Sequence, residues 1–322
     1  MQFSTVIPLY NKQQSIRRAI YSVLNQQSTS QENHELIIID DGSSDHSFDI
    51  VKRIQQEQPL RKIILHQQSN QGVSAARNQG IKLASNEHIT FLDADDSYEI
   101  NFYQEIQTLA EIHPTAQAFA TAYRFINTNT GNHRAANLVG LKNKQHQLLT
   151  DYFDSAAHGD LPITSSSVCI TKSALNYIGG FPIGDNMGED QAVWSQLALS
   201  FDIAISKVVC ANYFEAFSDS LMATVAPEGE RPFSQQLRHQ LETHCIPTRF
   251  RSSIQHYISG HLLDLVRRNL AAGEPMRAIK LLLDPYAKHQ SKRWCYWLAR
   301  STFSCLKNFL LFKSLGQEHS VY

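Results

Sequence analysis

The first 96 residues alternate between short apolar runs and helical patterns, and this alternation restricts the chain to few folds. Apolar, β-branched runs occupy residues 3–10, 34–40, 62–66 and 88–96. Between them, at 16–24, 48–54 and 72–84, apolar residues recur every three or four positions, as on one face of a helix. Strands that alternate with helices predict an α/β sheet with helices on both faces.

Three polar segments stand where these predicted strands end. Tyr10 and Asn11 end the first strand, Asp40 and Asp41 end the second, and residues 93–96 end the fourth. Ligands of such sheets bind beyond the carboxyl ends of the strands. We therefore expect the three segments to converge on one crevice, although they are far apart in sequence.

The segment 93–96 places Asp93, Asp95 and Asp96 directly after an apolar run. Like charges this close repel one another, and burial raises the cost, so a positive group should compensate them. A divalent cation is the first candidate, because Mg²⁺ binds carboxylates together with substrate phosphates. In a strand, Asp93 and Asp95 would point to the same side. The alternative is a solvated turn in which Asp96 or Ser97 caps the next helix.

Two further acidic segments each allow a structural and a functional interpretation. The DDG segment at 40–42 is typical of a turn, but a carboxylate there can also accept hydrogen bonds from a base or a ribose. In the GED segment at 188–190, Glu189 and Asp190 precede an apolar helix and could stabilise its dipole. An aspartate in a partly closed crevice could equally serve as a general base.

Composition excludes several classes of protein. The 322 residues, 42% of them hydrophobic, suffice for one large domain or for one domain and a smaller one. A net charge of -1 gives no basic excess for nucleic acid. The five scattered cysteines include no C-x-x-C pair, which is typical of a reducing cytoplasm. The N-terminus has no secretory pattern, and no apolar run approaches the roughly 20 residues of a membrane span.

Five segments, taken together, resemble the family-2 glycosyltransferases of the GT-A fold. They are VIPLYNKQQSIRRAIYSVLNQ, LIIIDDGSSD, GVSAARNQGI, FLDADD and GGFPIGDNMGED, and they occur in this order over about two thirds of the chain. The resemblance implies a Rossmann-like mixed sheet in a catalytic domain, which we place at residues 1–220. It also implies sugar transfer from a nucleotide diphosphate sugar, usually UDP-linked, with inversion at the anomeric carbon.

The resemblance implies a role for each matching residue. Asp190 would be the catalytic base, and Glu189 would help to order the base or the acceptor. Asp95 would bind the metal, Mn²⁺ or Mg²⁺, which would assist departure of the diphosphate. Eight residues would contact the nucleotide sugar: Pro8, Tyr10, Asn11, Asp40, Asp41, Arg77, Asp93 and Ala94.

The acceptor implied by the resemblance is a glycan or a lipid-linked hydroxyl, in bacterial capsule, lipopolysaccharide or exopolysaccharide biosynthesis. The sequence has no Q-x-x-R-W motif of processive synthases, so we expect a transferase that adds single sugars. One alternative is a nucleotidyltransferase, but VIPLYNK lacks the glycine-rich phosphate loop usual in those enzymes. Another is a non-catalytic nucleotide-sugar-binding protein, against which the presence of both Asp95 and Asp190 argues.

Three other features have structural interpretations. We interpret Trp194 as core packing on the apolar side of its helix. His158 and the run Thr164–Ser167 could contact donor or acceptor, but a solvated loop is the simpler interpretation.

The C-terminal region, residues 221–322, has no strand pattern beyond about residue 230 and is predicted to be helical. Residues 261–286 predict a helical hairpin that turns at 273–275. Residues 292–313 mix aromatic and basic side chains, as in helices that lie on a membrane surface. We therefore expect a cytoplasmic protein, with peripheral contact to the inner face of the membrane as one role for this helix. Packing on the catalytic domain or in a homodimer is the alternative, because Trp294 and Trp297 suit a core equally well.

Overall fold

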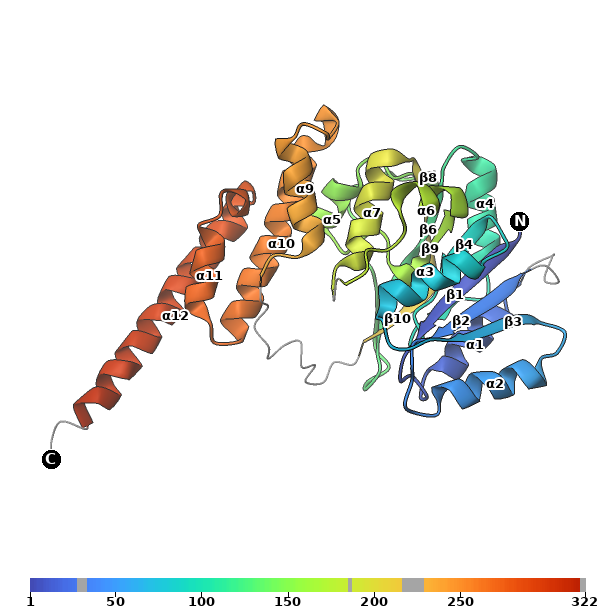
Figure 1. Ribbon diagram of the computed structural model, residues 1–322. Helices are drawn as coiled ribbons and strands as arrows, with labels where there is room; N and C mark the ends of the chain where they lie inside the picture. The colour runs from blue at the N-terminus through green and yellow to red at the C-terminus, as the bar shows by residue number, and fades with distance from the viewer. Residues whose placement is uncertain (28–33, 185–186, 216–228, 319–322) are drawn as a thin grey trace. The chain divides into compact units, whose positions relative to one another are not determined.

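The computed structural model describes residues 1–27, 34–184, 187–215 and 229–318, with side chains of the last helix described through residue 306. The chain divides into two compact units, residues 1–216 and 217–322 (Figure 1). The domain boundary predicted at residue 220 lies outside the described residues.

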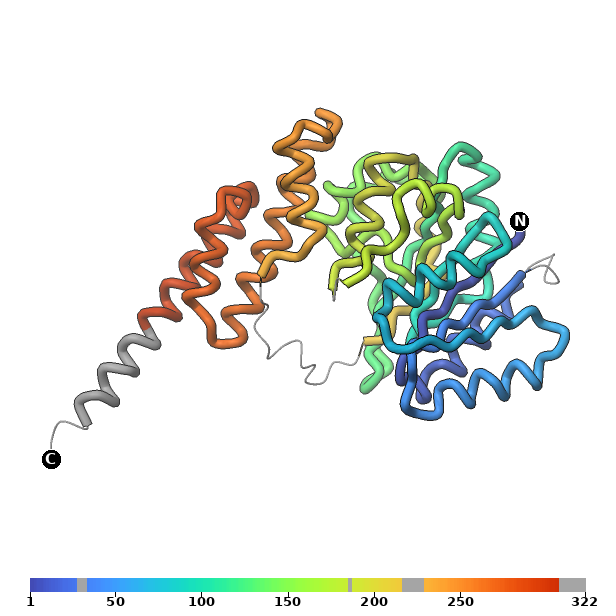
Figure 2. The backbone as a smooth tube through the Cα atoms, viewed as in Figure 1, coloured from blue at the N-terminus to red at the C-terminus, as the bar shows by residue number. Residues whose placement is uncertain are grey.

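The described residues of the first unit form a ten-stranded mixed sheet. Its strands are β1 (Phe3–Leu9), β2 (Glu35–Asp40), β3 (Lys62–Gln67), β4 (His88–Phe91), β5 (Ser97–Tyr98), β6 (Ala118–Asn127), β7 (His133–Ala135), β8 (His146–Leu148), β9 (Val168–Thr171) and β10 (Ile203–Glu215). The spatial order is β3-β2-β1-β4-β9-β6-β10-β5, with β7 paired to β6 and β8 paired to β10. The pairs among β1 to β4 are parallel, whereas β9 runs antiparallel to both of its neighbours. The chain's path through the strands can be followed in Figure 2.

Helices cover both faces of this sheet, as the sequence predicted. They are α1 (Ile16–Leu24), α2 (Ser47–Glu57), α3 (Val73–Leu83), α4 (Phe102–Ile112), α5 (Tyr152–His158), α6 (Lys172–Ile178) and α7 (Glu189–Ser200), with the 3-10 helix η2 (Ser165–Ser167). Apolar side chains of α1, α2 and α4 share one core with Ile7 and Leu9 of β1. Val6, which directly precedes Ile7 in β1, faces the opposite side of the sheet and meets α3. A Cβ on Gly80 of α3 would lie 2.2 Å from a Val6 methyl carbon, so only glycine permits this approach.

The fourth strand is shorter than predicted. We expected a strand over 88–96, but β4 ends at Phe91, and Asp96 N donates to Asp93 O at 2.9 Å to close a turn. This turn, rather than strand alternation, therefore sets the directions of Asp93 and Asp95. The polar stretch 127–137 contains β7, which forms a hairpin with β6.

The second unit is helical in its described part, as predicted. It contains α9 (Pro232–Glu242), α10 (Arg251–Ala271), α11 (Pro275–Leu282) and α12 (Ser291–Glu318), with 3-10 helices at Thr248–Phe250 and Pro285–His289. Gly273, with φ +78°, turns the chain from α10 to α11, where the sequence placed the hairpin turn. Trp294 and Trp297 of α12 pack against the core formed by α10 and α11. Among the described residues, no helix is both long enough and apolar enough to cross a membrane.

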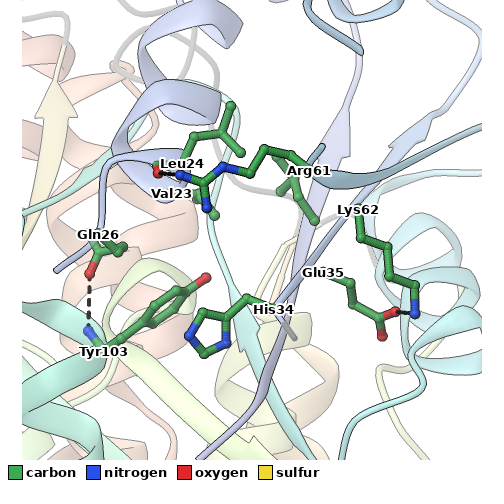
Figure 3. A pocket seen from close by; sticks show the side chains of 9 residues that line it. Val23, Leu24, Gln26, His34, Glu35, Arg61, Lys62 and Tyr103 are labelled. Carbon is green, nitrogen blue, oxygen red and sulfur yellow. Dashed lines mark hydrogen bonds and ion pairs between the residues drawn. The ribbon is translucent and has the colours of Figure 1, made fainter. Parts of the chain in front are cut away.

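A buried carboxylate, not singled out in the sequence, fixes the amino-terminal edge of the parallel strands. Glu35 is fully buried and pairs with Lys62 Nζ at 2.5 Å (Figure 3). It also accepts hydrogen bonds from Ser4 Oγ at 2.5 Å and from Ser85 Oγ at 2.8 Å. Burial alone would raise the pKa of Glu35, but these bonds lower it to about 2. The adjoining cavity of about 30 Å³ has room for little more than one water, so we assign this cluster a structural role.

The substitution Glu35→Gln should therefore weaken the fold at neutral pH. Because the folded pKa lies below the ordinary value of 4.5, the ionised form stabilises the fold above pH 4.5, and this contribution disappears as the pH falls through 2. A pKa shift of this size corresponds to about 3 kcal/mol of the free energy of unfolding. Urea unfolding at pH 7 and at pH 3 measures it, with the exposed Glu57→Gln as a control. An unchanged difference between the two pH values in Glu35→Gln would contradict the assignment.

Candidate functional site

A cavity of about 430 Å³ lies beyond the carboxyl ends of β1, β2 and β4. Each of the three polar segments that we expected to converge contributes to it. Its lining residues are Pro8, Leu9, Tyr10, Lys12, Asp41, Asn70, Gly72, Val73, Ala76, Arg77, Asp93, Ala94 and Asp95. The structure therefore brings together Pro8, Tyr10, Asp41, Arg77, Asp93, Ala94 and Asp95 from the predicted site residues.

Asp41 holds the loop that forms one wall of the cavity. Its side chain is buried and accepts hydrogen bonds from Gln68 Nε2 at 2.8 Å, Gln71 N at 2.9 Å and Gly72 N at 2.8 Å. Gly72 has φ +89°, a conformation that favours glycine, immediately before α3. Both oxygens of Asp41 are thus engaged by the protein, and the carboxylate positions the start of α3 beside the cavity.

Arg77 of α3 connects the cavity to the beginning of α7. Its side chain is only 4% exposed, and its guanidinium donates to Asp93 Oδ1 at 2.8 Å and to Glu189 Oε1 at 3.0 Å. The two carboxylates come from the turn after β4 and from the first residue of α7. Arg77 therefore links, through two ion pairs, the acidic turn and the helix that carries the predicted base.

Asp190, the second residue of α7, has an altered acidity. Burial and the charge of Glu189 raise the pKa of Asp190 to about 6, although the charge of Arg77 lowers it. Its Oδ1 accepts a hydrogen bond from Gln191 N at 2.7 Å. A carboxylate with a pKa near 6 is ionised at neutral pH and still basic enough to accept a proton from a reacting hydroxyl.

Asp95, the predicted metal ligand, is paired with a lysine that the sequence interpretation did not single out. Lys12 Nζ lies 2.5 Å from Asp95 Oδ2, and the two side chains are 43% and 40% exposed. Arg18 donates to the carbonyl oxygen of Asp95 at 2.5 Å. Within the described part of the chain, no three His, Cys, Asp or Glu side chains form a group that could hold a metal.

Asp96 plays a different part from its neighbours. It is 1% exposed, and it accepts hydrogen bonds from Ser166 Oγ at 2.5 Å and from Phe214 N at 3.1 Å. Burial and the charge of Asp93 raise the pKa of Asp96 well above its usual range. The alternative that Asp96 or Ser97 caps the next helix is wrong, because Asn101 is the N-cap of α4. The interpretation of Thr164–Ser167 as a solvated loop is also wrong. Ser165 to Ser167 are buried, and Ser166 ties Asp96 to the sheet.

Comparison with known proteins decides the family. The sequence profile of glycosyl transferase family 2 matches residues 4–168, slightly more than half of the chain. The chain belongs to this family. Its relative GgaB of Bacillus subtilis, named a minor teichoic acid biosynthesis protein, is 32% identical over 155 residues. That match covers 46% of this chain but only 17% of GgaB.

Solved structures show that this family-2 glycosyltransferase has the GT-A fold. Residues 1–349 of S. aureus TarS, in complex with UDP-GlcNAc, match with a TM-score of 0.59 at 16% identity, over 94% of this chain and 81% of the TarS chain. The mannosyltransferase PcManGT from Pyrobaculum calidifontis, in complex with GDP-Man and Mn²⁺, matches with a TM-score of 0.56 at 16% identity, over 95% of this chain and 86% of PcManGT. At this identity the likeness concerns the fold.

Two predicted nucleotide contacts of the glycosyltransferase do not line the cavity. Asn11 Oδ1 accepts from Ser44 N at 2.8 Å and so holds the turn after β2. Asp40 is fully buried and accepts from Gln67 Nε2 at 2.8 Å. Asn11 thus holds a loop near the cavity, and Asp40 ties the end of β2 to the end of β3. The contact of these two side chains with a nucleotide stays a prediction.

Two further residues singled out in the sequence have structural positions. Trp194 is fully buried in α7, which confirms its interpretation as core packing. His158 ends α5, half exposed, and its Nδ1 lies 3.2 Å from Asp154 Oδ1.

The two neighbouring carboxylates of α7 should affect stability in opposite directions. Glu189→Gln leaves the buried Arg77 with one ionic partner and should cost about 1–3 kcal/mol. Because the pKa of Asp190 rises from 3.8 to about 6 on folding, its ionisation lowers the free energy of unfolding, and this cost is complete above pH 6. Asp190→Asn removes the cost and should stabilise the fold by about 1–3 kcal/mol at pH 7.5. That gain should vanish near pH 4, where Asp190 is protonated. Urea midpoints of the two variants at both pH values test this, and equal losses in both would contradict it.

Proposed function

We propose that this glycosyltransferase moves a sugar from a nucleoside diphosphate sugar to an acceptor hydroxyl, with inversion at the anomeric carbon. One observation carries the proposal. Arg77 binds Asp93, in the wall of the cavity, and Glu189, which adjoins Asp190. The candidate base and the candidate donor cavity are thereby linked through a single buried side chain.

The proposed reaction is one displacement. The acceptor hydroxyl attacks C1 of the sugar, and the bond from C1 to the diphosphate oxygen breaks as the new C–O bond forms. Asp190 takes the hydroxyl proton, and the nucleoside diphosphate leaves with the bonding electron pair. With its pKa raised to about 6, Asp190 is ionised and ready for this step at neutral pH.

The donor would occupy the cavity beside Tyr10 and Asp41, with its diphosphate towards Arg77 and Asp95. A volume of about 430 Å³ falls within the usual range of small-molecule sites. The structural relatives contain UDP-GlcNAc in TarS and GDP-Man in PcManGT. We favour a UDP-sugar, because the sequence motifs resemble those of enzymes that use UDP-linked donors.

The residues present fit a divalent metal as a partner of the substrate. Asp95 lines the cavity and is 40% exposed, so one of its oxygens could bind Mn²⁺ or Mg²⁺. One protein carboxylate with substrate phosphates is a common arrangement for Mg²⁺. When bound, the ion would stabilise the negative charge of the leaving diphosphate.

The acceptor we propose is a glycan or lipid-linked hydroxyl in bacterial surface polysaccharide synthesis, such as that of capsule, lipopolysaccharide or exopolysaccharide. The relative GgaB, named for teichoic acid biosynthesis, supports this setting. We place the reaction in the cytoplasm, where nucleotide sugars are the natural donors for such a site.

The substitution Asp190→Asn tests the base. We expect it to retain donor binding and to lose transfer by a factor of about 100 or more. In the wild type, transfer should decline as the pH falls through about 6, because protonated Asp190 cannot accept a proton. Donor binding is measured by thermal shift with UDP-, TDP- and GDP-sugars, with and without Mn²⁺ or Mg²⁺. The exposed Asp202→Asn is the matched control.

The possible results test the base, the donor site and the catalytic activity separately. Full transfer by Asp190→Asn would exclude Asp190 as the base. A saturating donor stabilises the native state by roughly 2.7 kcal/mol at a hundredfold excess over its dissociation constant. No shift with any donor, in a folded sample, would contradict the donor site. Donor binding without transfer in the wild type, across a panel of acceptors, would favour a non-catalytic binding protein.

For the second unit we infer contact with an anionic membrane surface through α12. While Trp294 and Trp297 face the core of the unit, Tyr296, Phe303 and Leu306 are 53%, 70% and 60% exposed. Tyr296 and Phe303 line a groove of about 480 Å³ that also includes Arg300. Residues 285–317 contain six Lys or Arg and no Asp or Glu. Two copies joined through this face would bring like charges together, which favours anionic lipid over a homodimer.

The pair of substitutions Phe303→Ser and Leu306→Ser tests this surface. The wild type should sediment with phosphatidylglycerol vesicles at low salt and much less with phosphatidylcholine vesicles. The double variant should lose most of this binding, whereas Leu60→Ser, at a 97% exposed position outside the second unit, should not. Absence of wild-type binding at low salt, or undiminished binding by the double variant, would overturn the inference.

A further inference from the structure

Lys12 lines the cavity, but the proposed transfer reaction gives it no role. It follows β1, and its backbone is fixed: its N–H donates to Ser47 Oγ at 2.8 Å, and its carbonyl accepts from Ser15 N at 3.0 Å and from Ile16 N at 2.9 Å. From this fixed point the flexible side chain reaches 83 residues along the sequence to Asp95. The ammonium thus lies on the carboxylate that is best placed to bind a metal.

Asp93 and Asp95, two of the three aspartates that line the cavity, have partners of different kinds. Asp93 is bound by Arg77, which is 4% exposed and is held by a second carboxylate, Glu189. Asp95 is bound by Lys12, whose side chain is 43% exposed. Arg77 cannot leave without breaking both ion pairs of its buried guanidinium, whereas Lys12 can rotate into the cavity at little cost, because exposed ion pairs are weak. Lys12 is therefore the cation that can be exchanged.

We propose that Lys12 is an exchangeable counter-ion of Asp95. When a nucleoside diphosphate binds, Lys12 leaves Asp95 and a divalent cation takes its place. This inference rests on the proposed donor site. With the cavity empty of donor, the ammonium neutralises Asp95 and disfavours a metal. When a diphosphate enters, Lys12 pairs with a phosphate oxygen, and Asp95 becomes available to the metal that the same diphosphate also binds.

Electrostatics requires the departure of Lys12 from Asp95 to be coupled to the binding of the metal. An ammonium and a divalent cation on one carboxylate repel each other, so each weakens the binding of the other. A lysine ammonium is a compact charge that suits phosphate oxygens. Metal and nucleotide should then favour each other's binding by the same factor, because coupling between sites is reciprocal. Lys12 would make metal binding weak in the absence of donor and stronger in its presence.

The test measures each ligand alone with Lys12→Met, so that no catalytic turnover is needed. Mn²⁺ binding without nucleotide is followed by the electron paramagnetic resonance signal of free Mn²⁺. Binding of UDP, TDP and GDP is followed by equilibrium dialysis in the presence of a chelator. Lys12→Met should bind Mn²⁺ about tenfold more tightly and the nucleotide about tenfold more weakly than the wild type. Lys12→Arg, which keeps the charge, and the exposed Lys52→Met should resemble the wild type.

Opposite changes in the two affinities are the signature of exchange. General damage to the site would weaken both ligands, and a purely structural ion pair would change neither, so either result would overturn the inference. If nucleotide binds the wild type but Lys12→Met changes nothing, only the role of Lys12 fails. If the wild type binds none of the three nucleotides, even with Mn²⁺, the proposed donor site fails, and the exchange fails with it.

Discussion

The arrangement of the site depends on the buried guanidinium of Arg77. A cation that is 4% exposed requires anionic partners, and Arg77 obtains them from Asp93 and Glu189, whose chain positions lie 16 and 112 residues away. The ring of Phe181, 5.1 Å from the guanidinium carbon, adds a cation–π contact. Removing one partner would leave the buried charge only partly compensated, so both ion pairs hold the acidic turn, α3 and the start of α7 together.

Much of the sheet could be predicted from the sequence, because burial on both faces leaves a simple pattern. The run ELIIID is buried at all six positions of β2, and α1 buries Ile16, Ala19, Ile20 and Val23 at helical spacing. The convergence of Tyr10, Asp41 and Asp93 also followed from the rule that parallel strands present their carboxyl ends at one edge. These features depend on local periodicity and on topology, and the sequence contains both.

The pairings inside the site could not be predicted in the same way. Whether Lys12 meets Asp95, or Ser166 meets Asp96, depends on tertiary distances between segments 83 and 70 residues apart. The turn at Asp93–Asp96 was also hidden, because an apolar run followed by aspartates fits a longer strand equally well. Glu35 was missed for a related reason, because a charged residue at the start of an apolar run is usually expected to be exposed. Only its four hydrogen-bond donors explain its burial.

The crowding of carboxylates around the cavity is tolerated because the structure compensates them in several ways. Arg77 neutralises Asp93 and Glu189 from inside the protein. The raised pKa of Asp96 favours its protonated form, and Ser166 and Phe214 satisfy its oxygens. Asp190 lies between these cases, with its pKa raised to about 6. Asp95 alone in this set is compensated by a half-exposed, flexible side chain. Reversible exchange of charge can therefore occur at Asp95 with little disturbance of the fold, because the other carboxylates are part of the structure that holds the site in place.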